Sequence, residues 1–307
     1  MKTCLENIFA DELVARVSSA TVIRRDEPMA KHTTLRVGGP ADVFVEPASE
    51  ADLAAIVKLC GEHGIHFFIL GRGSNLLVRD GGFRGVVIRL SHPDFSKIEI
   101  AGEHLRCGAG AKLKNVAVEA KRASLGGLEF LEGIPGSVGG ALRMNAGAMG
   151  GATFDIVELV RFMDRTGNIF EKPRAEVPVE YRACPVFVEN IALAAVFKGV
   201  PTPRAEIEAK LNEFNRRRWE VQPTLPSAGC TFKNPAAIPA GKLIDELGLK
   251  GARVGGAMVS VEHGSFLVNT GGATAADMLE LIGVLQAKAK AERRIDLQPE
   301  VEIIGED

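Results

Sequence analysis

The sequence contains no long apolar run. No stretch of about 18 consecutive apolar residues occurs in it, so we expect no membrane span. Residues 1–10 include Glu6 and also lack an apolar run, which argues against a signal peptide. The formal net charge is −2 and no basic stripe stands out, so nucleic acid is not expected as a partner.

Cysteine is sparse and its positions are scattered. The chain carries five cysteines, an odd number, and no two of them lie at the spacing of metal ligands. A disulfide scaffold and a zinc site are therefore not expected, and reduced thiols fit a cytoplasmic protein. We predict no bound metal, and of the oligomeric states that the sequence leaves open we favour a monomer. The five residues are Cys4, Cys60, Cys107, Cys184 and Cys230.

Glycine, by contrast, is plentiful, and many of the 34 glycines are clustered. Clustered glycines indicate turns and places where the backbone closely approaches a ligand. Hydrophobic residues make up 46% and charged residues 25%, which is ordinary for a globular protein. A length of 307 residues predicts two or three domains.

Strand and helix patterns alternate in the first part of the chain. Ser49 is expected to cap a helix, with Asp52 three residues on in a variant of the capping box. A further helix is expected at residues 112–124, and residues 126–151 show no long periodic element. The predicted strands of this part are residues 42–46, 67–70, 86–90, 98–100, 104–107, 156–164, 167–170 and 191–197.

Residues 201–203 are the best candidate for a linker to a separate α+β domain. Residues 222–235 after it are expected to form a loop. The expected helices of this last part are residues 206–219, 241–247 and 274–291, and the expected strands are residues 265–269 and 301–304.

The first glycine cluster directly follows a predicted buried strand. Glycines at such a place let backbone N–H groups point outward as a nest for an anion, and pyrophosphate is the natural guest. A plain tight turn is the alternative. The cluster is not a dinucleotide-binding fingerprint of the Rossmann type, because Leu76 stands where the third glycine is required. It consists of Gly71, Arg72, Gly73, Ser74 and Asn75.

The second cluster spans residues 133–140 and continues at 145–148. Pro135 fixes φ at its position, and the glycines allow positive φ and close approach. Two separate glycine loops that flank one cleft can wrap an extended dinucleotide. The alternative is a chain that crosses tightly packed sheets.

Together these segments resemble the UDP-N-acetylenolpyruvoylglucosamine reductase (MurB) family of peptidoglycan synthesis. The matching stretches run in the family's order, at residues 33–40, 70–77, 133–147, 181–182, 226–235 and 298–301. The resemblance implies an α+β fold with a two-lobed FAD-binding region of the vanillyl-alcohol-oxidase type, at residues 1–90 and 91–202, and a C-terminal α+β substrate domain at residues 203–307.

The resemblance also implies FAD as cofactor and NADPH as electron donor. The substrate would be a nucleotide sugar, UDP-N-acetylglucosamine enolpyruvate, whose enolpyruvyl group is reduced to the lactyl ether of UDP-N-acetylmuramate by a hydride from reduced flavin. The residues expected to bind FAD are Arg36, Gly71, Arg72, Gly73, Ser74, Asn75, Leu76, Pro135, Gly136, Ser137, Gly139, Gly140, Asn145 and Gly147.

Three residues match the family's catalytic positions. Arg182 is expected to clamp the substrate carboxylate, because a guanidinium offers a planar fork and stays protonated; a surface pair with Glu180 is the alternative. Cys230 stands where the family most familiarly has a serine as proton donor. An unperturbed thiol has a pKa of about 8.5, far below that of a hydroxyl, so it suits proton donation. Glu300 is expected to assist charge development or proton delivery.

Other readings of these residues stay open. Without the resemblance, Cys230 is interpreted as a small buried residue. In that case Ser227 or Thr231 is the alternative proton donor. Glu300 lies two residues from Glu302 and fits an exposed carboxylate.

The resemblance assigns Tyr181, Asn234 and His263 to the substrate. Tyr181 is the only tyrosine, so the chain looks like the shorter subtype of the family, which lacks a tyrosine-bearing loop. Val221 replaces a lysine that is common in the family. The arginines at residues 216–218 are either a substitute phosphate-binding charge or a solvated helix face.

Two other functions compete with this interpretation. The first is an FAD-linked oxidase of the same fold, in which His32 is the only nearby histidine for a covalent flavin tether. The second is a flavin-binding or nucleotide-binding module without catalysis. The joint presence of Arg182, Cys230 and Glu300 speaks against the second.

Overall fold

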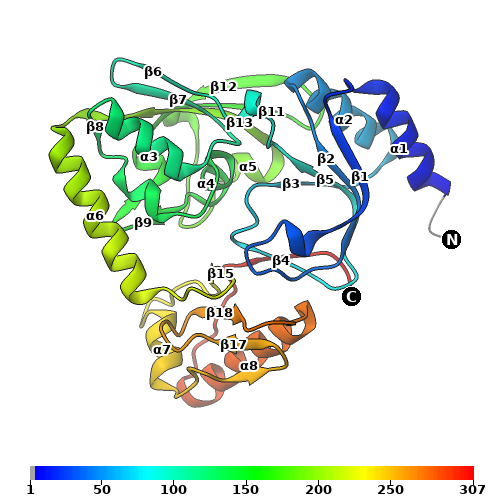
Figure 1. Ribbon diagram of the computed structural model, residues 1–307. Helices are drawn as coiled ribbons and strands as arrows, with labels where there is room; N and C mark the ends of the chain where they lie inside the picture. Colours follow the sequence, from blue (N-terminus) through cyan, green and yellow to red (C-terminus); the bar gives the residue numbers. More distant parts are fainter. Residues whose placement is uncertain (1–3) are drawn as a thin grey trace. The chain divides into compact units, whose positions relative to one another are not determined.

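The computed structural model describes residues 4–307 and divides them into two compact units (Figure 1). The first unit contains the N-terminal residues up to Arg25, Val43–Arg72 and Gly85–Arg217. The second contains Asp26–Asp42, Gly73–Arg84 and Arg218–Asp307. Residues 1–3, which begin the segment expected to carry no signal peptide, lie outside the described residues. The division into three lobes stays a prediction.

A five-stranded antiparallel sheet forms much of the first unit. Its order is β12-β11-β13-β7-β6. The sequence predicts the hairpin of β6 and β7, and the structure pairs Ile98 with Cys107 in it. Helix α4 packs against β13 and β7. The strands are β6 (Ile98–Ala101), β7 (His104–Gly108), β11 (Val157–Met163), β12 (Ile169–Pro173) and β13 (Ile191–Lys198). The helices near it are α3 (Leu113–Arg122), α4 (Val138–Met144) and α5 (Val186–Glu189).

A second sheet has the order β1-β2-β5-β3. Strands β3 and β5 are parallel, and Leu70 pairs with Arg89. The carboxyl ends of these two strands therefore meet at one edge, which is where the first glycine cluster begins. The strands are β1 (Val22–Pro28), β2 (Pro40–Glu46), β3 (Phe67–Leu70) and β5 (Phe83–Arg89).

Helix α2 (Glu50–His63) covers residues that the sequence predicts to be helical. Its N-cap is Ser49, whose hydroxyl accepts a hydrogen bond from the Asp52 backbone at 3.1 Å, as expected. The helix ends at Gly64, which adopts the left-handed conformation. Its apolar face is fully buried, and this anchors the start of the first unit.

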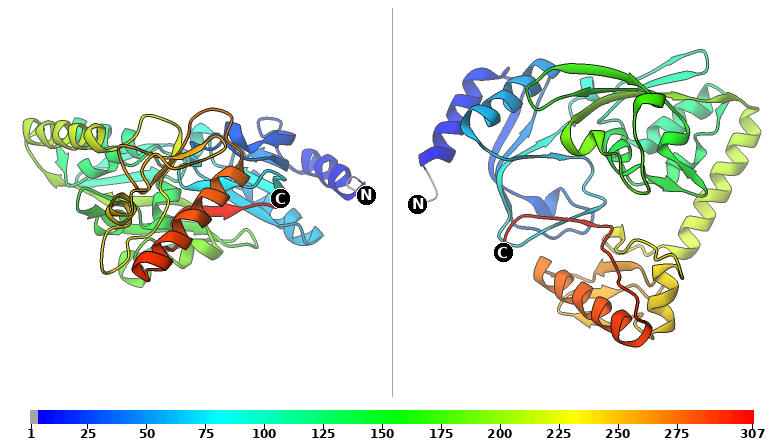
Figure 2. Two further views of the ribbon diagram at one scale, coloured as in Figure 1. Left: turned by 90° about the horizontal axis from the view of Figure 1, so that it is seen from below. Right: turned by 180° about the vertical axis from the view of Figure 1, so that it is seen from behind.

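The second unit is built on the antiparallel sheet β15-β18-β17-β16. Helix α8 (Ala275–Arg293) packs against β16 and β17 and also against α7 (Ala240–Glu246) (Figure 2). The core between them contains Leu243, Ile244, Met278, Leu281 and Leu285. The strands are β15 (Ser227–Cys230), β16 (Arg253–Val254), β17 (Ala257–Val259) and β18 (Phe266–Asn269).

Two short strands join distant parts of the chain in this unit. Strand β4 (Leu76–Val78) pairs in parallel with β19 (Glu302–Ile304), and Leu76 lies opposite Glu302. The sequence predicts β19 but not β4. This pairing places the end of the chain directly after the first glycine cluster.

Several other elements differ from the sequence-based expectation. Strand β15 lies inside the segment 222–235 that was expected to be a loop, and helix α1 (Cys4–Arg16) was not expected. In the expected linker, Pro201 pairs with Leu125. Helix α6 (Arg204–Val221) contains the helix expected at 206–219. The remaining strands are β8 (Leu125–Gly126), β9 (Gly147–Ala148), β10 (Gly151–Ala152) and β14 (Val200–Pro201).

Within residues 4–307 no helix is both long and apolar enough to cross a membrane. The same part of the chain contains no group of three or more His, Cys, Asp or Glu side chains suited to hold a metal ion. Cys60, Cys107, Cys184 and Cys230 take part in no disulfide.

Asp52 ties α2 to the segment before β1. Its two carboxylate oxygens accept hydrogen bonds from the Ser18 backbone and hydroxyl, each at 2.8 Å, and from the Thr21 hydroxyl at 3.0 Å. Burial alone would raise the pKa of this carboxyl, but these hydrogen bonds outweigh burial and lower the pKa of Asp52. The ionised form is therefore the one that stabilises the fold.

Asp52→Asn is expected to lower the free energy of unfolding by about 1–3 kcal/mol, because an amide cannot accept all three bonds. Since the folded-state pKa is depressed, the stabilisation by wild-type Asp52 is present above the unfolded pKa of about 3.9 and is lost as the pH falls through the folded value. Urea unfolding at pH 7 and in this acid range measures both effects. The exposed Asp11→Asn is the control, and an Asp52→Asn protein as stable as this control contradicts the prediction.

Candidate active site

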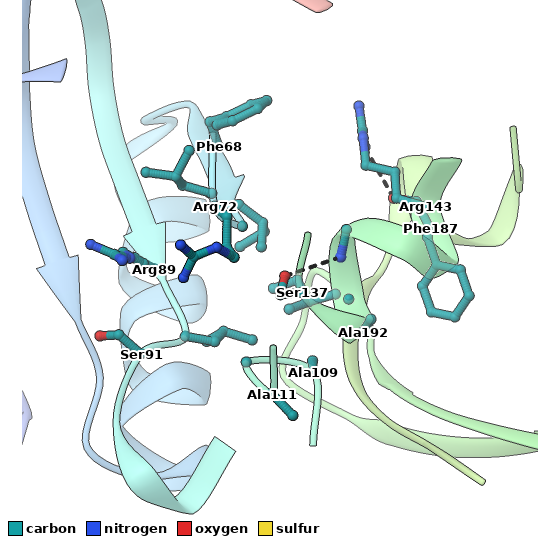
Figure 3. A pocket seen from close by; sticks show the side chains of 18 of the residues that line it. Phe68, Arg72, Arg89, Ser91, Ala109, Ala111, Ser137, Arg143, Phe187 and Ala192 are labelled. Atoms are coloured by element: carbon teal, nitrogen blue, oxygen red, sulfur yellow. Dashed lines mark hydrogen bonds between the residues drawn. The ribbon is translucent and has the colours of Figure 1, made fainter. Parts of the chain in front are cut away.

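A cavity of about 340 Å³ lies within the first unit. One wall comes from the ends of β3 and β5, and the other from α4, α5 and the start of β13. Arg72 and Arg89 lie on the first wall and Ser137 on the second (Figure 3). Its size is within the range of cofactor sites in proteins.

The two glycine clusters meet in this cavity. A Cβ atom added to Gly71 would lie 3.1 Å from Ser137 Oγ and 3.9 Å from the Gly140 Cα. Ser137 caps α4, and its Oγ accepts a hydrogen bond from the Gly140 backbone at 3.4 Å. The sequence predicts that the two clusters flank one cleft, and the structure brings these parts of them together. Gly139 also lines the cavity.

The lining carries a net positive charge, with five basic residues and one acidic residue, Glu189. Guanidinium and ammonium groups beside close-approaching backbone are the donors that a pyrophosphate requires. The residues present therefore fit the diphosphate part of FAD. The basic residues are Arg72, Arg89, Lys112, Arg143 and Arg165.

Sequence reasoning found Arg72 but missed the other four basic residues, which are Arg89, Lys112, Arg143 and Arg165. A signal for Arg89 was available, because it ends a strand that is parallel to the strand ending at Leu70, and such ends lie at one edge. No comparable sequence signal marks Arg143, which donates from Nη1 to the Phe187 carbonyl at 3.0 Å.

The rest of the second cluster lies outside the cavity lining. Asn145 ends α4 with φ of 39°, and its side-chain amide donates to the Glu180 carbonyl at 3.3 Å. A Cβ atom on Gly147 would lie 3.3 Å from Arg182 Nη1. Asn145 therefore bonds to the segment that carries Tyr181 and Arg182, and Gly147 lies beside the Arg182 guanidinium. Pro135 does not line the cavity, and a Cβ on its neighbour Gly136 would meet Leu113 at 3.2 Å.

Arg182 lies in a tight turn closed by two backbone hydrogen bonds between Glu180 and Ala183, at 2.9 and 3.3 Å. Its φ is 58°, in the left-handed region that a side chain such as arginine rarely adopts. The Arg182 guanidinium lies 5.3 Å from the centre of the Tyr181 ring, and Tyr181 is 61% exposed. Residues other than glycine that adopt this conformation are found most often at functional sites.

In the second unit, the first glycine cluster contacts the segment that carries Glu300. The Asn75 side-chain amide donates to the Glu300 carbonyl at 3.1 Å, and the Asn75 carbonyl accepts from the Glu302 backbone at 3.0 Å. The Glu300 backbone N–H donates to the Thr231 carbonyl at 2.8 Å. Glu300 is therefore held between the glycine cluster and the residue after Cys230.

Cys230 is the last residue of β15 and pairs with Phe266 of β18. The register of β15 shifts between Ser227 and Cys230, and Gly229 has φ of 77°. A bulge of this kind redirects the side chains that follow it. A Cβ on Gly229 would lie 3.9 Å from the Ser74 carbonyl oxygen. The segments that carry Cys230 and Glu300, the two residues selected from the sequence, therefore both contact residues 73–75.

The structure separates the first glycine cluster between the two units. Gly71 and Arg72 belong to the first unit, whereas Gly73, Ser74 and Asn75 belong to the second. From the sequence we expect residues 71–75 to form a single anion-binding nest, and no sequence feature indicates the division after Arg72. Leu76, also expected at the cofactor, is buried in β4. Arg36 has φ of 58°, and its backbone donates to Thr33 at 3.3 Å.

The residues expected to bind substrate differ in their surroundings. Asn234 Oδ1 accepts from the Ala240 backbone at the start of α7 at 3.0 Å. His263 Nδ1 accepts from the Ser265 backbone at 3.2 Å, so a neutral ring carries its proton on Nε2. Burial, and secondarily the charge of Lys250, lower the pKa of His263. The His263 ring is therefore held neutral in the physiological range.

Two further expectations concern phosphate binding by the arginines at residues 216–218 and a covalent flavin tether at His32. Arg217 pairs with Glu213 at 2.6 Å, and Arg218 Nε donates to Gln222 at 3.0 Å, so both bond to neighbours on the same stretch of chain. His32 lies 2.9 Å from a carboxylate oxygen of Glu27, and its side chain is 9% exposed.

Gly71→Val is expected to weaken FAD binding by about tenfold or more, because the added methyl groups must enter the 3.1 Å gap to Ser137. Titration of the apoprotein with FAD, followed by flavin fluorescence, measures the dissociation constant. Gly61→Ala in α2 is the control, since a Cβ there meets nothing within 4 Å. Wild-type affinity in Gly71→Val would show that the two clusters do not form the cofactor site.

Two protein-family models match the chain. An FAD-binding domain model matches residues 41–172, and the C-terminal domain model of UDP-N-acetylenolpyruvoylglucosamine reductase matches residues 222–304. The chain is similar along nearly its whole length to curated proteins of that reductase name. It is 44% identical over 284 residues to the protein of Clostridium botulinum (strain 657 / Type Ba4), covering 92% of both chains. It is 45% identical over 300 residues to that of Geobacter metallireducens, covering 97% of this chain and 99% of the relative.

Solved structures agree with this similarity. The crystal structure of UDP-N-acetylenolpyruvylglucosamine reductase (MurB) from Thermus caldophilus matches with a TM-score of 0.80 and 38% identity, covering 92% of this chain and 99% of that chain. A berberine bridge enzyme variant matches at 13% identity with a TM-score of 0.50, covering 64% of this chain and 44% of that chain, which concerns the fold alone. The expected fold, an FAD-binding region of the vanillyl-alcohol-oxidase type with a further C-terminal α+β domain, is confirmed.

Proposed function

Since the chain belongs to the UDP-N-acetylenolpyruvoylglucosamine reductase (MurB) family and is an FAD-dependent oxidoreductase of peptidoglycan synthesis, we propose that it reduces UDP-N-acetylglucosamine enolpyruvate to UDP-N-acetylmuramate with NADPH as electron donor. The observation that carries the proposal is the hydrogen-bonded frame of the second unit. It supports a site in which Cys230 and Glu300 act beside residues 73–75.

FAD, when bound, supplies the hydride for this reduction. The cavity of the first unit suits its diphosphate, with Gly71, Ser137 and Gly140 allowing close approach and Arg72 and the other basic residues offering charge. The residues proposed to contact FAD are those expected from the sequence, with Arg89, Lys112 and Arg143 added from the structure.

The side chains have separate tasks in the proposed reaction. The Arg182 guanidinium binds the carboxylate of the enolpyruvyl group and stabilises the negative charge that develops there. The Cys230 thiol gives its proton to the carbon next to that carboxylate, and Glu300 assists this delivery. Tyr181, Asn234 and the neutral His263 contact the nucleotide sugar.

The proposal includes the wider setting of the enzyme. Residues 1–90 and 91–202 are the two lobes for FAD, and residues 203–307 bind the substrate. We place the enzyme in the cytoplasm, where NADPH and a nucleotide-sugar substrate are available, and propose that it acts as a monomer.

Cys230→Ala removes the proposed proton donor, so we expect reoxidation of the reduced flavin by the enolpyruvyl sugar nucleotide to slow by about 10²- to 10⁴-fold. Reduction of the flavin by NADPH requires no proton from Cys230 and stays near the wild-type rate. Stopped-flow absorbance without oxygen measures the two half-reactions separately. Cys230→Ser keeps a donor of the type that is familiar in the family and retains much of the rate.

Cys60→Ala is the matched control, because Cys60 is a buried thiol of α2. It should leave both half-reactions unchanged. If Cys230→Ala also leaves both unchanged, Cys230 is not the donor. If wild-type protein reduced by NADPH is not reoxidised by the sugar nucleotide at all, the proposed function is wrong.

A further inference from the structure

Thr34 bonds two segments that are far apart in the sequence. Its hydroxyl lies 2.6 Å from the Ser227 carbonyl oxygen and 3.2 Å from the Gly73 carbonyl oxygen. Its backbone N–H donates to the same Gly73 carbonyl at 3.0 Å. One residue therefore contacts both the glycine cluster and the first residue of β15.

The hydroxyl has a single hydrogen, so the two short distances do not describe two full bonds. The distance to Ser227 is typical of a strong O–H···O bond, whereas the distance to Gly73 is longer than usual for such a bond. Gly73 already accepts from the Thr34 backbone. The Thr34 hydroxyl therefore donates its hydrogen bond to Ser227 of β15, and the Thr34 backbone N–H donates to Gly73 of the first glycine cluster.

Backbone hydrogen bonds flank β15, from the Asn269 N–H to the Pro226 carbonyl at 2.9 Å and from the Thr231 N–H to the Ser265 carbonyl at 2.7 Å. Between these bonds, Ser227 and Cys230 of β15 pair with β18, and the register shifts between these two residues. Gly229, within the shift, has φ of 77°, a conformation that glycine adopts freely. The bulge sets the direction of the Cys230 side chain, and the Thr34 hydroxyl bonds to the residue at which the bulge begins.

We propose that Thr34 is a positioning residue for the reaction: its hydroxyl fixes Ser227 and thereby sets the place of the Cys230 thiol relative to residues 73–75. The inference rests on the proposed function, in which Cys230 delivers the proton. Small misplacements matter in such a step, because proton delivery requires the donor within hydrogen-bond distance of the carbon's developing charge.

Thr34→Val and Thr34→Ser form a matched pair for the test. Valine keeps the shape and the backbone bond to Gly73 but loses the hydroxyl, whereas serine keeps the hydroxyl. In Thr34→Val, reoxidation of the reduced flavin by the sugar nucleotide should slow by about 10- to 100-fold. Thr34→Ser should stay close to wild type. Urea unfolding and flavin content of both variants show whether the fold and the cofactor are retained.

A general loss of structure is separated from an effect through Cys230 by a double variant. Adding Thr34→Val to Cys230→Ala should cause no further slowing, because the group that Thr34 positions is already absent. A further loss of 10-fold or more in the double variant, or wild-type reoxidation in Thr34→Val alone, would overturn the inference.

A second readout does not depend on the reaction. Alkylation of Cys230 by iodoacetamide, located by peptide mapping, should be faster in Thr34→Val than in wild type and unchanged in Thr34→Ser. If Thr34→Val and wild type are alkylated at the same rate, Thr34 is not a positioning residue, even if the enzyme turns over as proposed. Conversely, a changed alkylation rate in a protein that does not use the sugar nucleotide would keep the positioning and reject the proposed function.

Discussion

The hydrogen bonds of Asn75 to the backbone on both sides of Val301 are the interaction on which the arrangement of the second unit depends. The side-chain amide binds the Glu300 carbonyl, and the backbone carbonyl binds the Glu302 N–H. The end of the chain is thereby attached to the first glycine cluster and continues as β19 beside β4. Because Glu300 also bonds to Thr231, the segment after the proposed proton donor is held in the same frame.

The first unit is governed by a different constraint, which is the close approach of backbone to backbone. Gly71 lies so near Ser137 that any larger side chain would enter the space between the walls of the cavity. Arg89 of β5 on one wall and Arg143 of α4 on the other are among the basic residues that line the cavity. A positively charged gap lined by glycine suits a diphosphate, because basic side chains and closely approaching backbone can both bind its oxygens.

Much of the fold was predictable where one local signal decided it. The cap of α2 at Ser49, strand β3 and the hairpin of β6 and β7 follow from capping chemistry, apolar runs and alternation. Strand β15 was missed because Ser227, Ala228 and Gly229 have little preference for strands, and only their pairing with β18 makes them one. Strand β4 was missed because its partner lies more than two hundred residues away.

Prediction of the candidate site from the sequence fails for the same reason, where a feature depends on contacts between distant segments. Motif resemblance selected Cys230, Glu300 and Asn75, and the structure brings their segments together, but no local pattern indicated the bonds of Thr34 or the division of the glycine cluster after Arg72. Both features arise from tertiary contacts between distant segments.

The most direct test of the central claim is a single turnover without oxygen. Protein whose bound FAD has been reduced stoichiometrically is mixed with enolpyruvyl-UDP-N-acetylglucosamine, and the oxidised flavin and the product are quantified together by absorbance and mass spectrometry. The account predicts one molecule of UDP-N-acetylmuramate for each flavin reoxidised. Flavin that stays reduced, or that is reoxidised without this product, would contradict it.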